Sequence, residues 1–195
     1  VHRRRREADA VMIGSETAVR DNPALTTRTV SGRSPDRLVL DSRLRVSPGA
    51  RVWTPDAARR IAATTEAAPE EHRNALREKG VEVWILPSDA KGRVSLRQLA
   101  LRLGTEGYTN VLVEGGGNLA GALFEEHLVD TAHVVMAPRI LLGGGGPGWT
   151  QGLEVSAVPR AVRVARTDMG PLGPDWRISL VPEAAQWWDP ETAHV

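Results

Sequence analysis

The chain has 195 residues, of which 41% are hydrophobic and 25% charged, a composition typical of one soluble globular domain. The net charge of +1 gives no general attraction for nucleic acid or an anionic membrane, and no stretch is apolar enough to span a membrane or form a signal peptide. Cysteine is absent and the five histidines are scattered, so we expect no disulfide, no thiolate nucleophile and no metal site. We expect the protein to be cytoplasmic.

Helices and strands alternate along most of the chain. In chain order, the pattern predicts a helix at 1–8, strands at 9–14, 37–42 and 60–65, a helix at 69–80, a strand at 81–86, a helix at 95–107, a strand at 110–115, a helix at 118–128 and a strand at 131–138. Strands that are apolar on both faces and alternate with helices favour a mostly parallel sheet covered on both sides.

The last quarter of the chain has a different rhythm. Two strands are expected at 161–167 and 175–181, joined by a turn rich in proline and glycine that is too short for a crossover helix. Such strands pair antiparallel. We therefore predict an α/β fold with helices on both faces of the sheet and an antiparallel C-terminal hairpin, in one domain over 1–182 with a loose tail over 183–195.

Residues 111–124, VLVEGGGNLAGALF, join a buried strand to a helix through three glycines. The backbone N–H groups and positive dipole end of such a helix attract anions, and glycine lets a phosphate oxygen touch the main chain. We favour a phosphate site over a tight turn whose glycines serve packing alone. Glu114 ends the strand, where its carboxylate either braces the helix amides or hydrogen-bonds a ligand.

Two further polar segments follow predicted strands and should lie over the same edge. Residues 14–28 form a loop whose hydroxyl groups, carboxylates and arginine suit a sugar-phosphate ligand, although a simple surface loop has the same composition. The strand at 37–42 ends in Asp41 and Ser42, which could face an adenosine ribose. Arg43 follows it and could pair with a 2′-phosphate. A turn that Asp41 stabilises at the end of the strand explains this segment equally well.

The segments ADAVMIGSETAVRDNPALTTR, RLVLDSRLRV and NVLVEGGGNLAGALFEEHLVDTAHVVMAPRILLGG, with the closing hairpin, occur in an order that resembles the reductase domain of bacterial riboflavin biosynthesis. The resemblance covers roughly residues 1–181 and implies a dihydrofolate-reductase-like fold. It further implies that NADPH reduces 5-amino-6-(5-phosphoribosylamino)uracil, a small phosphorylated aminopyrimidine, to its ribitylamino form.

The resemblance also implies the residues of the site. NADPH would be held by Thr17, Asp21, Ser42, Gly116, Gly117, Asn118, Leu119, Ala120, Gly121 and Ala122. The substrate would be held by Arg5, Leu25, Arg28 and Glu114. Glu114 is the one candidate for a general acid, although a hydrogen bond to the substrate is the role that we favour.

Two features depart from the family pattern. The family's reductase domain opens with a central strand and a segment bearing serine and tryptophan, and both are missing here. We therefore expect a fragment of a longer product, whose site would be incomplete without them. The zinc deaminase domain that accompanies this family needs HxE and PCxxC motifs, which the chain lacks, so we expect no deaminase activity in it. The resemblance implies a deaminase domain in the full-length parent.

Two alternatives to this function remain open. A related pterin or dihydrofolate-type reductase would keep the fold but change the substrate. A non-catalytic module for nucleotide binding or subunit assembly would bind NADPH without oxidising it. If the protein is an oligomer, a two-fold homodimer is the commonest form.

Overall fold

The structure is a computed structural model that describes residues 1–27, 32–139, 148, 150–151 and 162–183. The chain divides into two compact units, residues 1–119 and 120–195, with the boundary inside one helix. The single domain expected over residues 1–182 stays a prediction. Within the described ranges no helix is long and apolar enough to cross a membrane.

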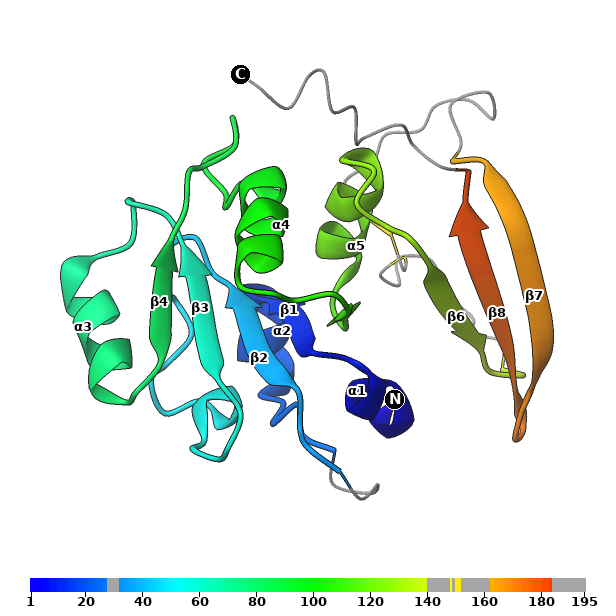
Figure 1. The fold of residues 1–195 in the computed structure, drawn as a ribbon, viewed down its shortest axis with the longest axis horizontal. Helices are drawn as coiled ribbons and strands as arrows, with labels where there is room; N and C mark the ends of the chain where they lie inside the picture. The colour runs from blue at the N-terminus through cyan, green and yellow to red at the C-terminus, as the bar shows by residue number, and fades with distance from the viewer. Residues whose placement is uncertain (28–31, 140–147, 149, 152–161, 184–195) are drawn as a thin grey trace. The chain divides into compact units, whose positions relative to one another are not determined.

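The first unit is built on a parallel sheet with the strand order β4-β3-β2-β1-β5 (Figure 1). In chain order its elements are α1 (His2–Glu7), β1 (Ala10–Gly14), α2 (Ser15–Asp21), β2 (Asp36–Leu40), the 3₁₀ turn η1 (Arg51–Trp53), β3 (Arg60–Thr64), α3 (Glu70–Glu78), β4 (Glu82–Ile85), α4 (Leu96–Thr105) and β5 (Val111–Val113). All four strand pairings are parallel, which confirms the predicted α/β sheet.

The connections of this sheet explain why it is covered on both faces. The chain runs from β1 to β4 in one direction across the sheet and then returns beyond β1 to form β5. Right-handed crossovers therefore place α2 and α3 on one face and α4 on the other, and Figure 1 shows α4 in front of the strands and α2 behind them. The interior strand β1, between β2 and β5, is buried on both faces, with Ala10 and Val11 at 0% exposure.

Local sequence signals set the helix ends. Helix α3 follows Pro69, carries two glutamates in its first turn and is followed by Gly80, whose φ of +71° favours glycine. Helix α4 is capped by Ser95, whose hydroxyl oxygen accepts a hydrogen bond from the Gln98 amide at 3.4 Å.

One segment of the first unit has a different structure from the prediction. Residues 15–21, expected as part of a polar loop, form the helix α2, which begins after the extended Gly14 and ends at Asn22 with a left-handed φ of 41°. Ala18 is the buried residue of this helix, so its apolar face is too small to show as a periodic pattern. The remainder of the segment, residues 22–27, has no regular structure.

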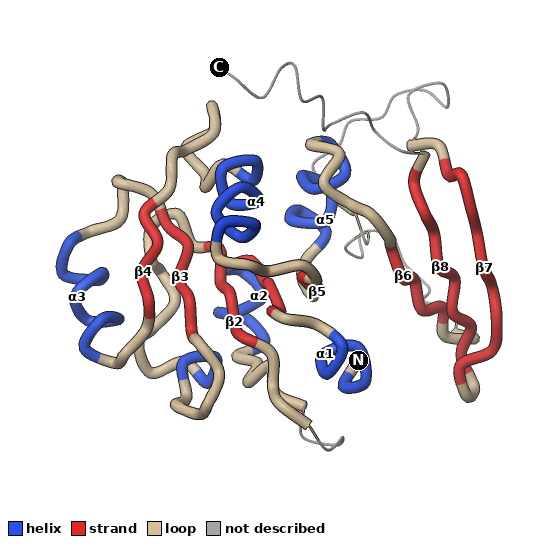
Figure 2. The backbone as a smooth tube through the Cα atoms, in the orientation of Figure 1, coloured by secondary structure: helices blue, strands red, loops and turns tan. Residues whose placement is uncertain are grey.

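The second unit contains an antiparallel sheet with the order β6-β8-β7 (Figure 2). Its elements are the C-terminal part of α5 (Gly117–Glu125), β6 (Ala132–Met136), β7 (Val164–Leu172) and β8 (Asp175–Pro182). The predicted hairpin is confirmed, with Leu172 opposite Asp175, but its bounds differ from the prediction. Strand β7 continues through residues 168–172, which were expected in the turn, and the turn is formed by residues 173–174. Strand β6, which continued the alternation of strands and helices in the sequence, instead pairs antiparallel with β8.

The two faces of the antiparallel sheet differ in polarity. The strand register aligns two rows of side chains on one face, and both rows are apolar: Met136, Trp176 and Pro171 in the first, Val134, Ile178 and Met169 in the second. The other face carries His133 and Asp168 opposite Ser179. This alternation has the period of two that is typical of strands with one apolar face.

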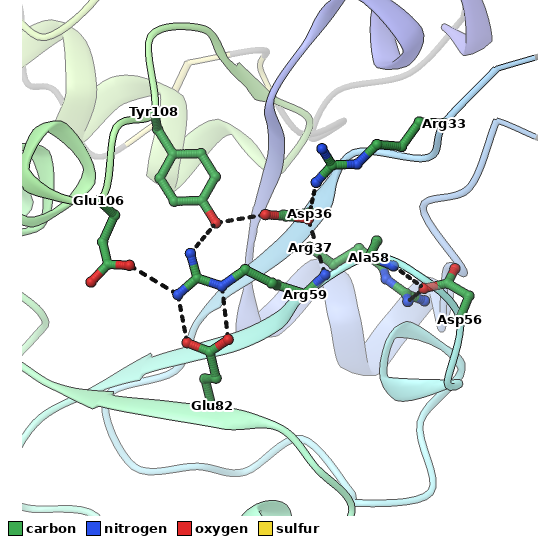
Figure 3. Close-up of polar contacts among 9 residues, drawn as sticks. All are labelled: Arg33, Asp36, Arg37, Asp56, Ala58, Arg59, Glu82, Glu106 and Tyr108. Carbon is green, nitrogen blue, oxygen red and sulfur yellow. Dashed lines mark hydrogen bonds and ion pairs between the residues drawn. The ribbon is translucent and has the colours of Figure 1, made fainter.

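A polar network ties the parallel strands together at their amino-terminal ends (Figure 3). The Arg59 guanidinium donates two hydrogen bonds to the Glu82 carboxylate, at 2.8 and 2.7 Å, and one to Glu106 at 2.9 Å. It also donates to the Tyr108 hydroxyl, which in turn donates to the buried Asp36 carboxylate at 2.7 Å. Burial, and then this bond to Asp36, raise the pKa of Tyr108. The network fixes β2, β3 and β4 side by side.

The network should make folding stability sensitive to acid. The hydrogen bond from Arg59 lowers the pKa of Glu82 below the ordinary glutamate value of 4.5. A lowered carboxyl pKa stabilises the protein above pH 4.5, and this contribution disappears as the pH falls through the folded-state pKa. We expect Arg59→Met to lower the free energy of unfolding by about 1 kcal/mol at neutral pH, because the Arg59 and Glu82 side chains are 36% and 43% exposed and water screens the pair, and to lose part of the acid dependence.

Urea denaturation at neutral pH and at steps below pH 4.5 measures both effects. Arg77→Met is the matched control, because Arg77 is an exposed arginine of α3 that bonds Glu70 and Asn74 outside the network. Equal acid dependence in the wild type and in Arg59→Met would show that the Glu82 pair does not couple to folding.

Candidate functional site

The carboxyl-terminal ends of β1 and β5 meet at one edge of the parallel sheet. Met12 is paired with Val113, and a Cβ atom built on Gly115 would lie 3.6 Å from the Gly14 nitrogen. The expectation that Gly14 and Gly115 share an edge is therefore confirmed. Because the chain leaves β1 toward β2 on one side while β5 lies on the other, this edge is the topological switch point, where open α/β sheets bind their ligands.

Neither backbone conformation nor packing explains Gly116, the second glycine of the turn. Gly115 and Gly116 have no positive φ. Within the described residues, a Cβ atom on Gly116 would meet only the Thr17 hydroxyl oxygen, at 3.6 Å, and one on Gly115 would make ordinary contacts of 3.6–3.7 Å. Among the described residues, the space beside Gly116 is therefore bounded by the Thr17 hydroxyl alone, which favours a ligand there over the packing explanation, whereas Gly115 packs against β1 and Thr17.

Thr17 of α2 reaches across to this turn. Its hydroxyl oxygen accepts a hydrogen bond from the Gly116 amide at 3.1 Å. The turn leads directly into α5, whose first-turn amides have no acceptors inside the helix and lie at its positive dipole end. These donors and the adjacent hydroxyl suit a phosphate.

Gly121, in the second turn of α5, has a packing explanation of its own. A Cβ atom on Gly121 would collide with the main-chain carbonyl of Gln151. Glycine is therefore required there by the close approach of two backbone segments within the second unit. A contact of Gly121 with a cofactor stays a prediction.

Arg5 and Glu114, both expected to face a substrate, bind each other. Arg5 Nε and Nη2 donate to the two Glu114 oxygens at 2.7 and 2.6 Å, and Nη1 donates to the Thr26 carbonyl at 3.0 Å. The Arg5 side chain is 9% exposed and that of Glu114 is 22% exposed. The pair connects α1 to the end of β5 beside the glycine turn, so both residues lie at the predicted edge.

The segment after α2 places another predicted residue in the core. Leu25 is buried at 2% exposure, and its φ of 55° lies in the left-handed region. Such a conformation costs about 1 kcal/mol or more for a residue with a side chain and is frequent at functional sites. Because the side chain packs into the core, only the Leu25 backbone could contact a ligand. Arg28 lies outside the described residues.

The polar residues after β2 hold their own turn. The buried Asp41 carboxylate accepts hydrogen bonds from the amides of Val46 at 2.8 Å and Arg43 at 3.4 Å, which confirms the turn explanation of this segment. The Ser42 hydroxyl oxygen accepts from the Val94 amide at 3.0 Å. Asp21, at the end of α2, is half-exposed and pairs with Arg20.

The structure thus brings Thr17, Gly116, Arg5 and Glu114 to one edge. Sequence reasoning missed a further contact there, in which Arg45 donates to the Ser15 hydroxyl. No pattern in the sequence signals this contact, because the two residues lie 30 positions apart. Among the described side chains no group of three carboxylates or histidines is arranged to bind a metal.

The family model of the RibD C-terminal domain matches residues 1–178. The chain belongs to this family. The RibD protein of Chlamydia muridarum is 42% identical over 151 residues, which are 75% of this chain and 40% of that protein. A 2,5-diamino-6-ribosylamino-4(3H)-pyrimidinone 5′-phosphate reductase of Methanothermobacter thermautotrophicus is 34% identical over 178 residues, 90% of this chain and 80% of that protein.

Solved structures agree with the family on the fold. RibD of Acinetobacter baumannii superposes with a TM-score of 0.77 over 93% of this chain and 49% of that one, at 23% identity. A bifunctional deaminase and reductase of Thermotoga maritima superposes with a TM-score of 0.68 over 93% of this chain and 47% of that one, at 27% identity. The chain therefore spans less than half the length of the RibD proteins it matches here.

Proposed function

We propose that the chain catalyses the NADPH-dependent reduction of 5-amino-6-(5-phosphoribosylamino)uracil to the ribitylamino product in riboflavin biosynthesis. The observation that carries the proposal is the open glycine turn at the switch point between β1 and β5, where Gly116 lies beside Thr17. Membership of the RibD C-terminal domain family supports it. The Thermotoga maritima neighbour bears the name of this uracil reductase.

The cofactor would lie along this edge, held by Thr17, Asp21, Ser42 and residues 116–122. When bound, its nicotinamide supplies a hydride for the sugar C1 of the substrate. The ribosyl ring first opens to an imine, C1 then gains the hydride and the neighbouring nitrogen gains a proton. The part of the protein is to bind, orient and stabilise charge.

The substrate would lie against Arg5, Leu25, Arg28 and Glu114. A guanidinium has five N–H donors, and three of those of Arg5 are bound to Glu114 and Thr26. No hydrogen bond from the remaining two, on Nη1 and Nη2, is seen within the described residues, and in this proposal they bind a phosphate or a sugar oxygen of the substrate. In this proposal Glu114 fixes the orientation of Arg5, and its carboxylate also accepts a hydrogen bond from the substrate.

A second substrate is favoured by the relatives of comparable length. The reductases of Methanothermobacter thermautotrophicus and Archaeoglobus fulgidus, of which this chain covers 80% each, are named for the 2,5-diamino pyrimidinone 5′-phosphate. That compound carries an amino group where the uracil carries a carbonyl.

The wider assembly that we propose is a cytoplasmic homodimer, joined to a deaminase domain in the full-length parent.

Turnover with the purified full-length parent, which restores the N-terminal strand and segment of the family pattern, decides between these substrates. We expect the uracil substrate to cause loss of NADPH absorbance and to yield the ribitylamino product, identified by mass spectrometry. The diamino pyrimidinone and dihydrofolate serve as competing substrates. NADPH binding without oxidation in the presence of any of the three would contradict a reductase and favour a non-catalytic nucleotide-binding module.

A further inference from the structure

The turn that follows β2 projects an arginine over the edge that holds the glycine turn. Gly14 of β1 pairs with Leu40 of β2, so the residues after both strands emerge side by side. Arg45 Nη2 donates to the Ser15 hydroxyl at 2.8 Å, which ties the turn after β2 to the start of α2. The Arg45 side chain remains 66% exposed, so most of its guanidinium faces solvent.

The neighbouring Asp41 carboxylate does not prevent an anion from binding to Arg45. Asp41 is 2% exposed, and its oxygens accept from the amides of Val46 and Arg43. Arg45 Nε lies 3.8 Å from one of these oxygens, a long contact, and Nη2 bonds Ser15, so within the described residues the other N–H groups of the guanidinium remain for an anion. If the Asp41 carboxylate pointed outward, it would instead bind a ribose hydroxyl and repel a phosphate.

Contacts within the first unit connect this arginine to the glycine turn. The Gly116 amide bonds Thr17, and two residues earlier on α2 Ser15 bonds Arg45. The glycine turn follows β5, and the turn that carries Arg45 follows β2. Only β1 lies between these two strands, so they are two strand spacings, or about 10 Å, apart. In an adenine dinucleotide, only a few bonds across the adenosine ribose separate the pyrophosphate from the 2′-position. A dinucleotide whose pyrophosphate lies at Gly116 can therefore extend its 2′-position toward Arg45.

We propose that Arg45, positioned by Ser15 and by the buried Asp41, binds the 2′-phosphate and makes the protein select NADPH over NADH. The inference rests on the proposed function. It differs from the expectation that Arg43 has this role, because Arg43 is exposed without an anchor that corresponds to Ser15, within the described residues. A planar guanidinium held at one nitrogen presents the others to a phosphate at little cost in side-chain entropy.

Binding of NADPH, NADH and 2′,5′-ADP to the wild type, Arg45→Ala and Arg45→Lys tests the inference. We expect Arg45→Ala to weaken NADPH and 2′,5′-ADP by about ten- to a hundredfold and to leave NADH within about twofold. Arg45→Lys should recover part of the loss, and Ser15→Ala should cause a smaller loss of the same selectivity. Arg43→Ala and the remote Arg77→Ala are the matched controls.

The outcomes separate the two proposals. Equal weakening of NADPH and NADH in Arg45→Ala, no change in either, or a selective loss in Arg43→Ala alone would overturn the role of Arg45 while the reductase function stands. Equal affinity of the wild type for NADPH and NADH would do the same. A wild type that binds neither dinucleotide would overturn the proposed function and this inference together.

Discussion

Gly116→Val should weaken NADPH binding by at least about a hundredfold, which corresponds to roughly 2.7 kcal/mol, while the protein stays folded. A Cβ atom at this position meets the Thr17 hydroxyl oxygen at an ordinary 3.6 Å, and Gly116 has no positive φ. The substitution is therefore compatible with the protein's own packing. The branched side chain instead fills the space in front of the α5 amides, where a phosphate must touch the main chain.

Calorimetric titration with NADPH measures the affinity, and circular dichroism with thermal unfolding monitors the fold. Gly116→Ala should have an intermediate effect, because it adds one methyl group to the same space. Gly104→Val is the matched control, since a Cβ atom on this exposed glycine of α4 would meet nothing within 4 Å. A folded Gly116→Val protein with unchanged NADPH affinity would defeat the anion-site proposal.

Arg5→Met should lower the free energy of unfolding by about 2–3 kcal/mol and should also lower kcat/KM. The Arg5 side chain is 9% exposed and makes two short bonds to Glu114, so its loss leaves the carboxylate without its cation at the end of β5. Glu114 remains 22% exposed, and water therefore offsets part of the cost.

A double-mutant cycle separates the pair from its two members. Arg5→Met, Glu114→Gln and the combined variant are compared by urea denaturation, and we expect a coupling energy of about 1–2 kcal/mol. The same variants are assayed for kcat/KM below their unfolding temperatures, together with Arg28→Ala, which removes another arginine assigned to the substrate. Additive effects on stability would mean that the pair contributes nothing, and unchanged kcat/KM in all three single variants would refute the substrate assignment.

Features set by neighbouring residues were predictable from the sequence. Parallel strands bring their carboxyl ends to one edge, so the shared position of Gly14 and Gly115 followed from two strand patterns. Helix α2 was missed because one buried alanine makes no periodic stripe. Strand β6 was assigned to the wrong sheet, because its apolar run fits either partner.

Contacts between distant residues could not be predicted in the same way. Arg5 and Glu114 are 109 positions apart, and each alone has the chemistry of a ligand-binding residue. Their pairing depends on the direction in which α1 leads into β1. Likewise, nothing near Gly121 in the sequence indicates that the Gln151 carbonyl packs against it.

The network around Arg59 has a consequence for how this protein can change over evolution. Its members lie at the amino-terminal ends of the strands, whereas Arg45, Thr17 and the glycine turn lie at the opposite ends. Residues that secure the order of the strands are therefore distinct from residues that meet a ligand. Descendants of this sequence could exchange the exposed Arg43 and Arg45 for another cofactor preference while the buried residues of the same turn and the sheet keep their architecture, so specificity can drift under weak constraint from foldability.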